Sequence, residues 1–274
     1  MTYRTAVPAD VLANVRRRWP EAAESWATQA ELQLRELCAR YRATPREVLP
    51  ARYGFVVAVD TADGPLVIRS SPDPHGKDQA AVAVALAELG IAPRVHEAFS
   101  TEHGTWTVLD QVLPGTPLSQ ADPAAVDPQA LFTPLAAMAD QPPPTVGMPS
   151  ILDWLRDRLE DDHLTDLRPG TTVASASERR AALEVLADLT RDHIPALCHG
   201  DTSSGNILAH GPNRWMFIDP RGMTGEHSYD VAVLALRVGT VYRSPDLADV
   251  IASLAQADTE RLRAWMKIAQ AARV

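Results

Sequence analysis

The fold of this chain is decided by the stretch His199-Gly200-Asp201-Thr202-Ser203-Ser204-Gly205-Asn206 and the apolar run that follows it, Trp215-Met216-Phe217-Ile218, which ends on Asp219. Three oxygen-bearing side chains stand in order: Asp201, then Asn206, then Asp219 at the end of a predicted strand. Phosphoryl transfer needs a carboxylate that accepts the proton of the attacking hydroxyl, and hard oxygen ligands for magnesium on the nucleotide phosphates. The ordered set supplies both, so it predicts a site for phosphoryl transfer.

Each piece of this set is a weak signal by itself. A lone His-Gly-Asp is more often a turn than a site, and Asn206 alone could satisfy a loop backbone. The order of the three groups, with a strand between the last two, is much more specific. Protein-kinase-like enzymes arrange their base and their magnesium ligands in this order.

Length and composition place the chain among folded cytoplasmic proteins. The 274 residues are enough for two lobes, and a hydrophobic fraction of 46% excludes large-scale disorder. No apolar run has the length of a bilayer span, and the N-terminus lacks the apolar core of a signal peptide. We therefore expect a cytoplasmic protein without a membrane partner.

Charge and metal-binding residue types exclude further classes. The net charge of −9 argues against nucleic acid as a partner, and it gives a weak indication of a cationic substrate. Cys38 and Cys198 fit no ligand spacing, so reduced, buried thiols are expected. The eight histidines form no helix-spaced pair of the zinc-hydrolase kind, so no structural metal is predicted.

Residues 1–112 are predicted to form helices and then a small sheet that covers a nucleotide. Apolar residues at helical spacing predict helices over Ala9–Arg42, divided at Pro20. The turn-rich segment Asp60–Gly64 joins two β-rich runs into a hairpin. The remaining elements are a helix over Lys77–Leu89 and strands over Arg94–Ala98 and Thr105–Leu109.

Residues 113–274 are predicted to be mainly helical, which makes this half the catalytic and substrate lobe. The expected helices cover Pro123–Ala139, Ser150–Asp162, Ser177–Arg191, Tyr229–Val241, Pro245–Gln256 and Asp258–Ala272, with Ser150 as a cap. The predicted fold class is therefore α+β: a bilobal protein-kinase-like fold with a small antiparallel-sheet N-lobe and a mainly helical C-lobe.

The sequence resembles the aminoglycoside/hydroxyurea antibiotic-resistance kinases of the streptomycin 6-phosphotransferase type. In that family the strand-end aspartate precedes Pro-x-Gly-x-x-Gly-(Glu or Asp), and Tyr-Asp-Leu-Ala follows. This chain carries Asp219-Pro220-Arg221-Gly222-Met223-Thr224-Gly225-Glu226 and then Tyr229-Asp230-Val231-Ala232. Segments 63–68 and 113–118 are also similar, so the resemblance covers most of the chain. It implies ATP and Mg²⁺ as cofactors and a hydroxyl of an aminoglycoside or related amino-sugar-like compound as acceptor.

The resemblance also implies roles for single residues of the motif. Asp201 would be the catalytic base, and Asn206 and Asp219 would hold magnesium; their amide and carboxylate oxygens suit this hard cation in any case. His199 would be structural. Asp230 would brace the same loop, although a plain helix-start carboxylate favoured by the helix dipole is an equal interpretation.

Two further residues are candidates for substrate contacts. Glu226 follows closely after the predicted metal-binding strand. Ser203 belongs to Thr202-Ser203-Ser204, where relatives usually carry a leucine and histidines. Contacts of that loop with substrate or phosphate are therefore expected to differ from the family's.

The expected nucleotide contacts depart from the family at one position. The family places a lysine at the end of the small-lobe strand, and this chain has Arg69, which keeps the charge with a different geometry. Its usual glutamate partner is replaced by Asp78 or Gln79. Lys77 could substitute from the same helix, although a solvated lysine at a helix start is the favoured interpretation. Adenine would be bound by the hinge backbone, that is by Asp110, Gln111, Val112 and Leu113.

Two alternatives from other classes stay open. Arg69 and the missing glutamate favour a pseudokinase-like binding protein, whereas the intact Asp201, Asn206 and Asp219 oppose it. A magnesium-dependent hydrolase could use the two aspartates, but the spacing fits kinases better and no P-loop or nucleophile elbow occurs. The acceptor, the choice between ATP and GTP, and the oligomeric state are not determined by the sequence.

Overall fold

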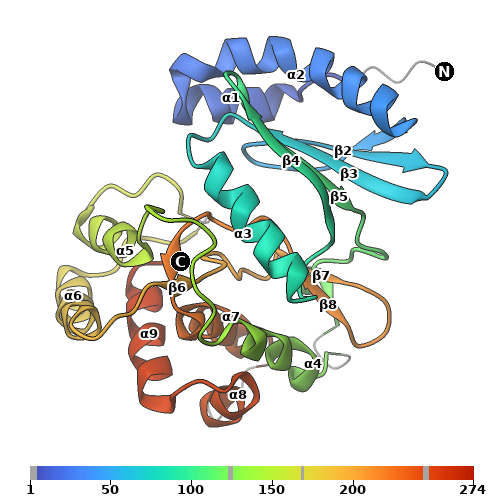
Figure 1. The fold of residues 1–274 in the computed structure, drawn as a ribbon. Coiled ribbons are helices and arrows are strands. Elements are labelled where there is room, and N and C mark those ends of the chain that lie inside the picture. Colours follow the sequence, from blue (N-terminus) through green and yellow to red (C-terminus); the bar gives the residue numbers. More distant parts are fainter. Residues whose placement is uncertain (1–4, 123–125, 168–169, 243–246) are drawn as a thin grey trace. The chain divides into compact units, whose positions relative to one another are not determined.

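A computed structural model describes residues 5–122, 126–167, 170–242 and 247–274 of the chain. The chain divides into two compact units, Met1–Val112 and Leu113–Val274 (Figure 1). Within these ranges, no helix has both the length and the apolar character needed to cross a membrane.

The first unit is a five-stranded antiparallel sheet with helices on both faces. Two helices precede it, α1 (Ala9–Arg18) and α2 (Pro20–Tyr41), and Pro20 opens α2 as expected for a proline in a first helical turn. The strand order is β1-β2-β3-β5-β4. The strands are β1 (Thr44–Val48), β2 (Phe55–Thr61), β3 (Gly64–Ser71), β4 (Val95–Thr101) and β5 (Gly104–Asp110).

Side-chain alternation along β5 explains how the sheet is covered on its two faces. Trp106 and Val108 point into a core that α1 and α2 close, and the Trp26 indole of α2 donates to the Ser70 hydroxyl at 3.0 Å. Thr105, which precedes Trp106 in β5, faces α3 (Gly76–Glu88) on the opposite face of the sheet. A Cβ at Gly76 would lie 2.6 Å from the Thr105 hydroxyl, so glycine allows this close approach of helix and strand.

The strand β1 is not in the sequence prediction. Among the strands that the structure describes, it pairs with β2 alone, at the edge of the sheet, and its register shifts between Pro45 and Glu47. Proline is tolerated at an edge or a bulge because no ladder hydrogen bond is then lost. The hairpin, α3 and the strands β4 and β5 lie where the sequence predicts them.

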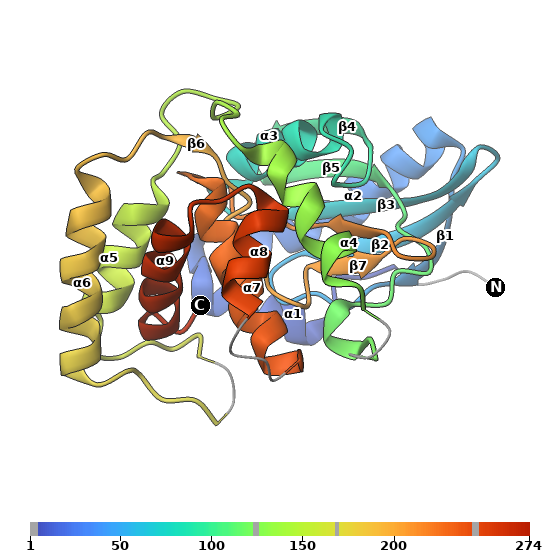
Figure 2. The same ribbon diagram turned by 90° about the horizontal axis from the view of Figure 1, so that it is seen from below.

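The second unit is mainly helical and contains two very short sheets. In Figure 2, α5 and α6 lie beside α9, and α7 packs against both α8 and α9. The helices are α4 (Pro128–Phe132), α5 (Ile151–Glu160), α6 (Ala176–Thr190), α7 (His227–Tyr242), α8 (Leu247–Ala255) and α9 (Thr259–Ala271), with 3-10 turns η1 (Leu118–Gln120) and η3 (Thr133–Met138). The sheets pair β6 (Ala196–Leu197) with β9 (Thr224–Gly225) and β7 (Ile207–Ala209) with β8 (Trp215–Phe217).

Local signals account for most helix boundaries in this unit. The Ser150 hydroxyl accepts the Leu152 amide, which confirms the predicted cap of α5. The single helix predicted over Pro123–Ala139 is wrong, because prolines in the first turns of α4 and η3 divide it. The predicted starts at Pro123 and Pro245 lie outside the described residues.

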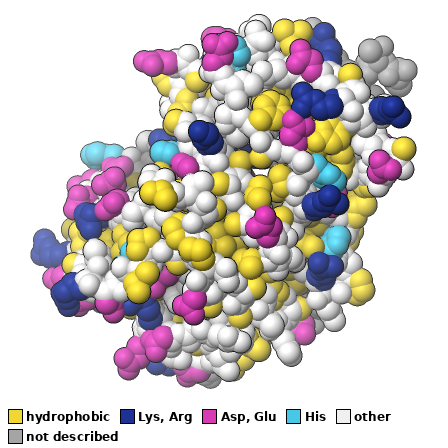
Figure 3. Space-filling view, viewed as in Figure 1, with side chains coloured by type: hydrophobic (Ala, Val, Ile, Leu, Met, Phe, Trp, Pro, Cys, Tyr) yellow, Lys and Arg dark blue, Asp and Glu magenta, His cyan; other side chains and the backbone are white. Residues whose placement is uncertain are grey.

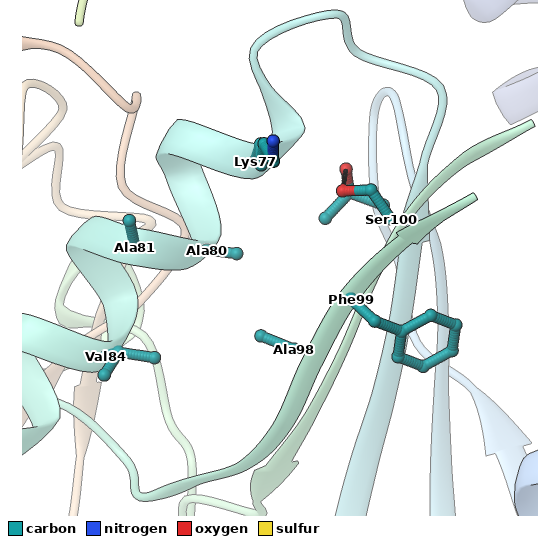
Figure 4. Close-up of a pocket in the computed structure, with 8 residues that line it drawn as sticks. Lys77, Ala80, Ala81, Val84, Ala98, Phe99 and Ser100 are labelled. Carbon is teal, nitrogen blue, oxygen red and sulfur yellow. Dashed lines mark hydrogen bonds between the residues drawn. The ribbon is translucent and has the colours of Figure 1, made fainter. Parts of the chain in front are cut away.

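The observed fold confirms the predicted α+β class, with an antiparallel sheet in the first part and a mainly helical remainder. On the face seen in Figure 3, acidic and basic side chains lie interspersed and form no single-sign field. A shallow hollow of about 240 Å³ lies between α3 and β4–β5, where Ala80, Val84 and Ala98 leave space (Figure 4).

Candidate active site

The hairpin of β7 and β8 brings the predicted metal ligands together. Ile207 pairs with Phe217, so the residues just outside the ladder, Asn206 and Ile218, are also adjacent. The Ile218 amide donates to the Asn206 carbonyl at 2.9 Å. Asp219 follows with φ of 57°, a left-handed conformation that is uncommon for a residue with a side chain. Asn206 and Asp219 thus begin and end one tight hairpin.

The Asn206 side chain has a defined orientation. Its Nδ2 atom donates to the Asp201 carbonyl oxygen at 3.1 Å. The amide oxygen is then left as the acceptor, and among the described residues it has no hydrogen-bond partner. An oriented amide oxygen, on a residue whose hairpin also carries Asp219, fits a magnesium ligand set that nucleotide oxygens and water complete. No cluster of three or more His, Cys, Asp or Glu suited to a metal occurs in the described part of the chain.

His199 connects the two ends of the motif. Its Nε2 atom lies 3.0 Å from the Ile218 carbonyl, and its Nδ1 atom accepts the Asp201 amide at 3.2 Å. The two contacts select the neutral tautomer with the proton on Nε2. The ring is fully buried, and this burial lowers the pKa of His199 to about 4. The geometry therefore gives His199 a structural task rather than proton transfer.

Asp230 braces the same loop from the first turn of α7. Its carboxylate accepts the His199 amide at 2.7 Å and the Gly200 amide at 2.8 Å. Its own carbonyl accepts the Thr202 hydroxyl at 2.7 Å. Burial raises the pKa of Asp230 to about 7, against the two backbone hydrogen bonds, which lower it. Of the two interpretations left open by the sequence, these contacts favour the loop brace.

Asp201 is held by its backbone on both sides, through His199 and Asn206, and its side chain is about one-third exposed. One carboxylate oxygen lies 3.5 Å from Arg221 Nη2. The other has no hydrogen-bond partner among the described residues. Arg221 was not predicted as a site residue. It also contacts Trp154, which is distant in the sequence, so no local pattern indicated this contact.

Glu226 and Ser203 differ in what their side chains can still bind. Both carboxylate oxygens of Glu226 are engaged, one by Arg261 Nε at 2.7 Å and one by Trp265 Nε1 at 2.5 Å. These bonds fix the start of α7 to α9 and favour a structural role over the expected substrate contact. Ser203 is half-buried, and its hydroxyl has no partner in the described part of the chain.

In the first unit, the structure selects the partner of Arg69. Its Nη2 atom donates to Gln79 Oε1 at 3.2 Å, and Gln79 Nε2 donates to Asp73 Oδ2 at 2.9 Å. Asp78 instead lies 3.9 Å from His75. Lys77 lines the hollow of Figure 4. Of the two candidates on α3, Gln79, oriented by Asp73, thus contacts Arg69, and Asp78 contacts His75 instead.

The predicted hinge offers fewer backbone groups than its length suggests. The Asp110 amide donates to the Arg94 carbonyl at 2.9 Å, and the Gln111 amide donates to Pro65 at 3.0 Å. The Val112 and Leu113 amides have no partner among the described residues. Of the four residues expected to bind adenine, these two retain a free backbone donor.

Comparison with known proteins adds a family match across most of the chain. The family model described as the phosphotransferase enzyme family (APH) matches residues 45–267. Streptomycin 3''-kinase of Klebsiella pneumoniae is 35% identical over 74 residues, which is 25% of this chain and 25% of that protein. Hydroxyurea phosphotransferase of Kitasatospora aureofaciens is 32% identical over 99 residues, 34% of this chain and 28% of that protein. The matches span little more than a quarter of either relative.

Solved structures show the same fold at low sequence identity. Aminoglycoside phosphotransferase APH(4)-Ia matches with a TM-score of 0.58 at 16% identity, covering 87% of this chain and 88% of that one. Spectinomycin phosphotransferase APH(9)-Ia, in complex with ADP and spectinomycin, gives 0.57 at 12% identity, with 88% and 85% covered. An ethanolamine kinase of Plasmodium vivax gives 0.55 at 15% identity, with 92% and 78% covered.

Proposed function

Because this chain belongs to the phosphotransferase enzyme family (APH), we propose that it is an ATP- and magnesium-dependent small-molecule O-phosphotransferase with Asp201 as its base. In this proposal residues 1–112 cover the nucleotide, and residues 113–274 carry the catalytic and substrate groups. The observation that supports it most is the orientation of Asn206, whose amide nitrogen is bound by the Asp201 carbonyl and whose oxygen is left for a cation.

The proposed reaction uses the carboxylate oxygen of Asp201 that has no hydrogen-bond partner. That oxygen accepts the proton of the acceptor hydroxyl while the hydroxyl oxygen forms a bond to the γ-phosphorus of ATP. The bond between this phosphorus and the β–γ bridging oxygen breaks, and ADP leaves. Asn206 and Asp219 would hold magnesium, which neutralises charge on the nucleotide phosphates when bound. His199 and Asp230 keep the loop in position and take no proton in the reaction.

Nucleotide binding is assigned to Arg69 of the first unit and to the residues that follow β5. Arginine can fork onto phosphate oxygens, and Gln79 orients its guanidinium. Val112 and Leu113 supply the backbone donors for the base. Structures of APH(4)-Ia have been solved with AMP-PNP or ADP bound, which makes an adenine nucleotide the first one to test.

The acceptor we propose is a hydroxyl of an aminoglycoside or a related amino-sugar-like compound. Support comes from the similarity to streptomycin 3''-kinase and hydroxyurea phosphotransferase, together with the net charge of −9, which favours a cationic ligand. An antibiotic-resistance role or a role in secondary metabolism would follow from such an acceptor.

A coupled ADP-release screen tests this proposal. It would cover aminoglycosides, amino sugars and hydroxyurea with ATP or GTP, with and without Mg²⁺. We expect magnesium-dependent ADP release that rises with one acceptor, and a phosphate ester of that acceptor by mass spectrometry. ATP binding with neither ADP release nor a phosphorylated acceptor over the whole panel would contradict the proposal.

The second candidate is a pseudokinase-like binding protein, favoured by Arg69 in place of the lysine that the family carries at the end of the small-lobe strand. Isothermal titration of Mg²⁺–ATP, combined with the acceptor screen, separates the two candidates. ATP binding with no turnover over the whole acceptor panel would favour the binding protein. No detectable ATP binding would exclude both.

A further inference from the structure

The Arg221 side chain makes an unusual set of contacts around the proposed base. Its Nε atom donates to the Gly200 carbonyl at 3.2 Å, and its Nη2 atom lies 3.5 Å from Asp201 Oδ2. Its guanidinium carbon lies 4.2 Å from the ring centroid of Trp154, on α5. One planar cation is thus in contact with the backbone before Asp201, with the Asp201 carboxylate and with an aromatic face.

The backbone on both sides fixes where this guanidinium can be. The Arg221 amide donates to the His199 carbonyl at 2.8 Å, which ties the turn after Asp219 to the start of the loop. Gly200 has φ of 79°, and a Cβ there would lie 2.9 Å from Arg221 Cβ. Glycine at this position therefore permits both the turn of the loop and the close passage of the arginine.

The chemistry of arginine suits this position better than that of lysine. The guanidinium is planar and carries donors in a fixed fork, so it can bind a carbonyl and a carboxylate at once while its face stacks on an indole. A lysine ammonium is a point charge without a stacking face. The contacts with Gly200, Asp201 and Trp154 use all three properties of the arginine.

We propose that Arg221, supported by Trp154, is a positioning residue for the Asp201 carboxylate in the proposed phosphotransfer reaction. It occupies one carboxylate oxygen, so that the other is presented to the acceptor hydroxyl. The proposal rests on the proposed function, because it gives Arg221 its task through Asp201. It adds a residue of α5, outside the motif, to the machinery of the site.

The orientation of a base affects the chemical step more than binding. A misplacement of about 1 Å can cost roughly 100-fold in rate. We therefore expect Arg221→Gln to lower kcat by about 10- to 100-fold, with KM for ATP and acceptor changed by less than about three-fold. Arg221→Lys, which keeps the charge, should recover only part of the loss. Trp154→Leu should lower kcat, and Trp154→Phe, which keeps an aromatic face, should lower it less.

Chemical rescue distinguishes positioning from a general loss of structure. In Arg221→Ala, guanidinium chloride at concentrations far below unfolding should raise kcat, because the free cation can occupy the vacated place on Trp154. The same salt should leave wild type and Asp201→Asn unchanged. ATP-binding stoichiometry by calorimetry gives the folded fraction, so that kcat is counted per competent molecule. If the screen yields no acceptor, hydrolysis of ATP with water as acceptor is the readout.

The outcomes separate this inference from the proposed function. If Asp201→Asn loses activity while Arg221→Gln keeps kcat within about two-fold of wild type, the role of Arg221 is contradicted and the base assignment stands. If Asp201→Asn keeps its activity, both the assignment of Asp201 as the base and the role of Arg221 are contradicted. A kcat loss in Arg221→Gln with unchanged KM, together with guanidinium rescue of Arg221→Ala, supports the inference.

Discussion

The Nε2 atom of His199 lies 3.0 Å from the carbonyl oxygen of Ile218, which connects the residue two before the proposed base to the residue just before a proposed magnesium ligand. The other ring nitrogen accepts the Asp201 amide. A single neutral imidazole thus sets the distance between the two ends of the motif.

Acid should weaken the fold through His199. Burial lowers its pKa to about 4, so from the ordinary value of 6.5 down to 4 the unfolded chain binds a proton that the folded chain does not. Stability must then fall as pH falls through this window, by roughly 3 kcal/mol in total. The measurement is urea unfolding of wild type and His199→Gln between pH 4 and 7.

The difference in free energy of unfolding between wild type and His199→Gln cancels the contributions of groups that titrate in both proteins. The pKa of Asp230 is raised to about 7, so its contribution to stability has the opposite pH dependence and is lost as pH rises toward 7. Asp230 is present in both proteins, so this contribution cancels in the comparison. The stability advantage of wild type should shrink as pH falls below 6.5. An advantage that stays constant from pH 7 to pH 4 would show that the ring is not held neutral.

Removal of the Asp230 carboxylate should destabilise the second unit strongly. Asp230→Ala leaves the buried His199 and Gly200 amides without acceptors, at about 1–3 kcal/mol for each unsatisfied donor. A carboxylate acting only through the helix dipole would contribute about 0.3–1 kcal/mol. Chemical denaturation separates these values, and Thr202→Val, which loses one hydroxyl hydrogen bond, is the matched control.

Arg69 should matter more for nucleotide affinity than Lys77. We expect Arg69→Ala to weaken Mg²⁺–ATP binding about 10-fold or more, and Gln79→Ala to weaken it less, because the arginine remains but is no longer oriented. Lys77→Ala serves as the control, since this residue lines the separate hollow beside β4. The measurement is isothermal titration. A larger effect of Lys77→Ala than of Arg69→Ala would assign the phosphate contact to the lysine.

Glu226 should affect stability and not substrate binding. Glu226→Gln weakens the contact with Arg261 and can satisfy only one of the two donors well, so a loss of about 1–3 kcal/mol is expected. KM for the acceptor should stay unchanged. Thermal unfolding and steady-state kinetics on the same preparation give both quantities. A raised KM for the acceptor with unaltered stability would instead support the expected contact of Glu226 with the substrate.

The sequence predicted those elements whose signals are local. Periodicity and turn residues gave the helices α1, α2 and α3 and the hairpin of β2 and β3, and Ser150 marked the start of α5. The edge strand β1 was missed because Pro45 and the charged residues beside it resemble a loop. The strands β6 and β9 have two residues each and are defined by their pairing with each other, so no local sequence pattern could indicate them.

The candidate site shows the same division. The order of Asp201, Asn206 and Asp219 is a property of the sequence, and the structure adds how each group is held. The choice of Gln79 over Asp78 beside Arg69 depends on the geometry of the first turn of α3. The contact of Arg221 with Trp154 joins residues distant in the sequence, and it becomes visible only when α5 is packed in place.

The most direct test of the central claim is phosphoryl transfer by Asp201→Asn under single-turnover conditions, with Mg²⁺–ATP and the acceptor found by screening. Asp188→Asn is the matched control, because Asp188 is an exposed carboxylate on α6 paired with Arg191. We expect Asp201→Asn to lower the rate of phosphate-ester formation by about 10²- to 10⁴-fold with ATP affinity retained, and Asp188→Asn to match wild type. An Asp201→Asn protein that phosphorylates the acceptor at the wild-type rate would contradict the account.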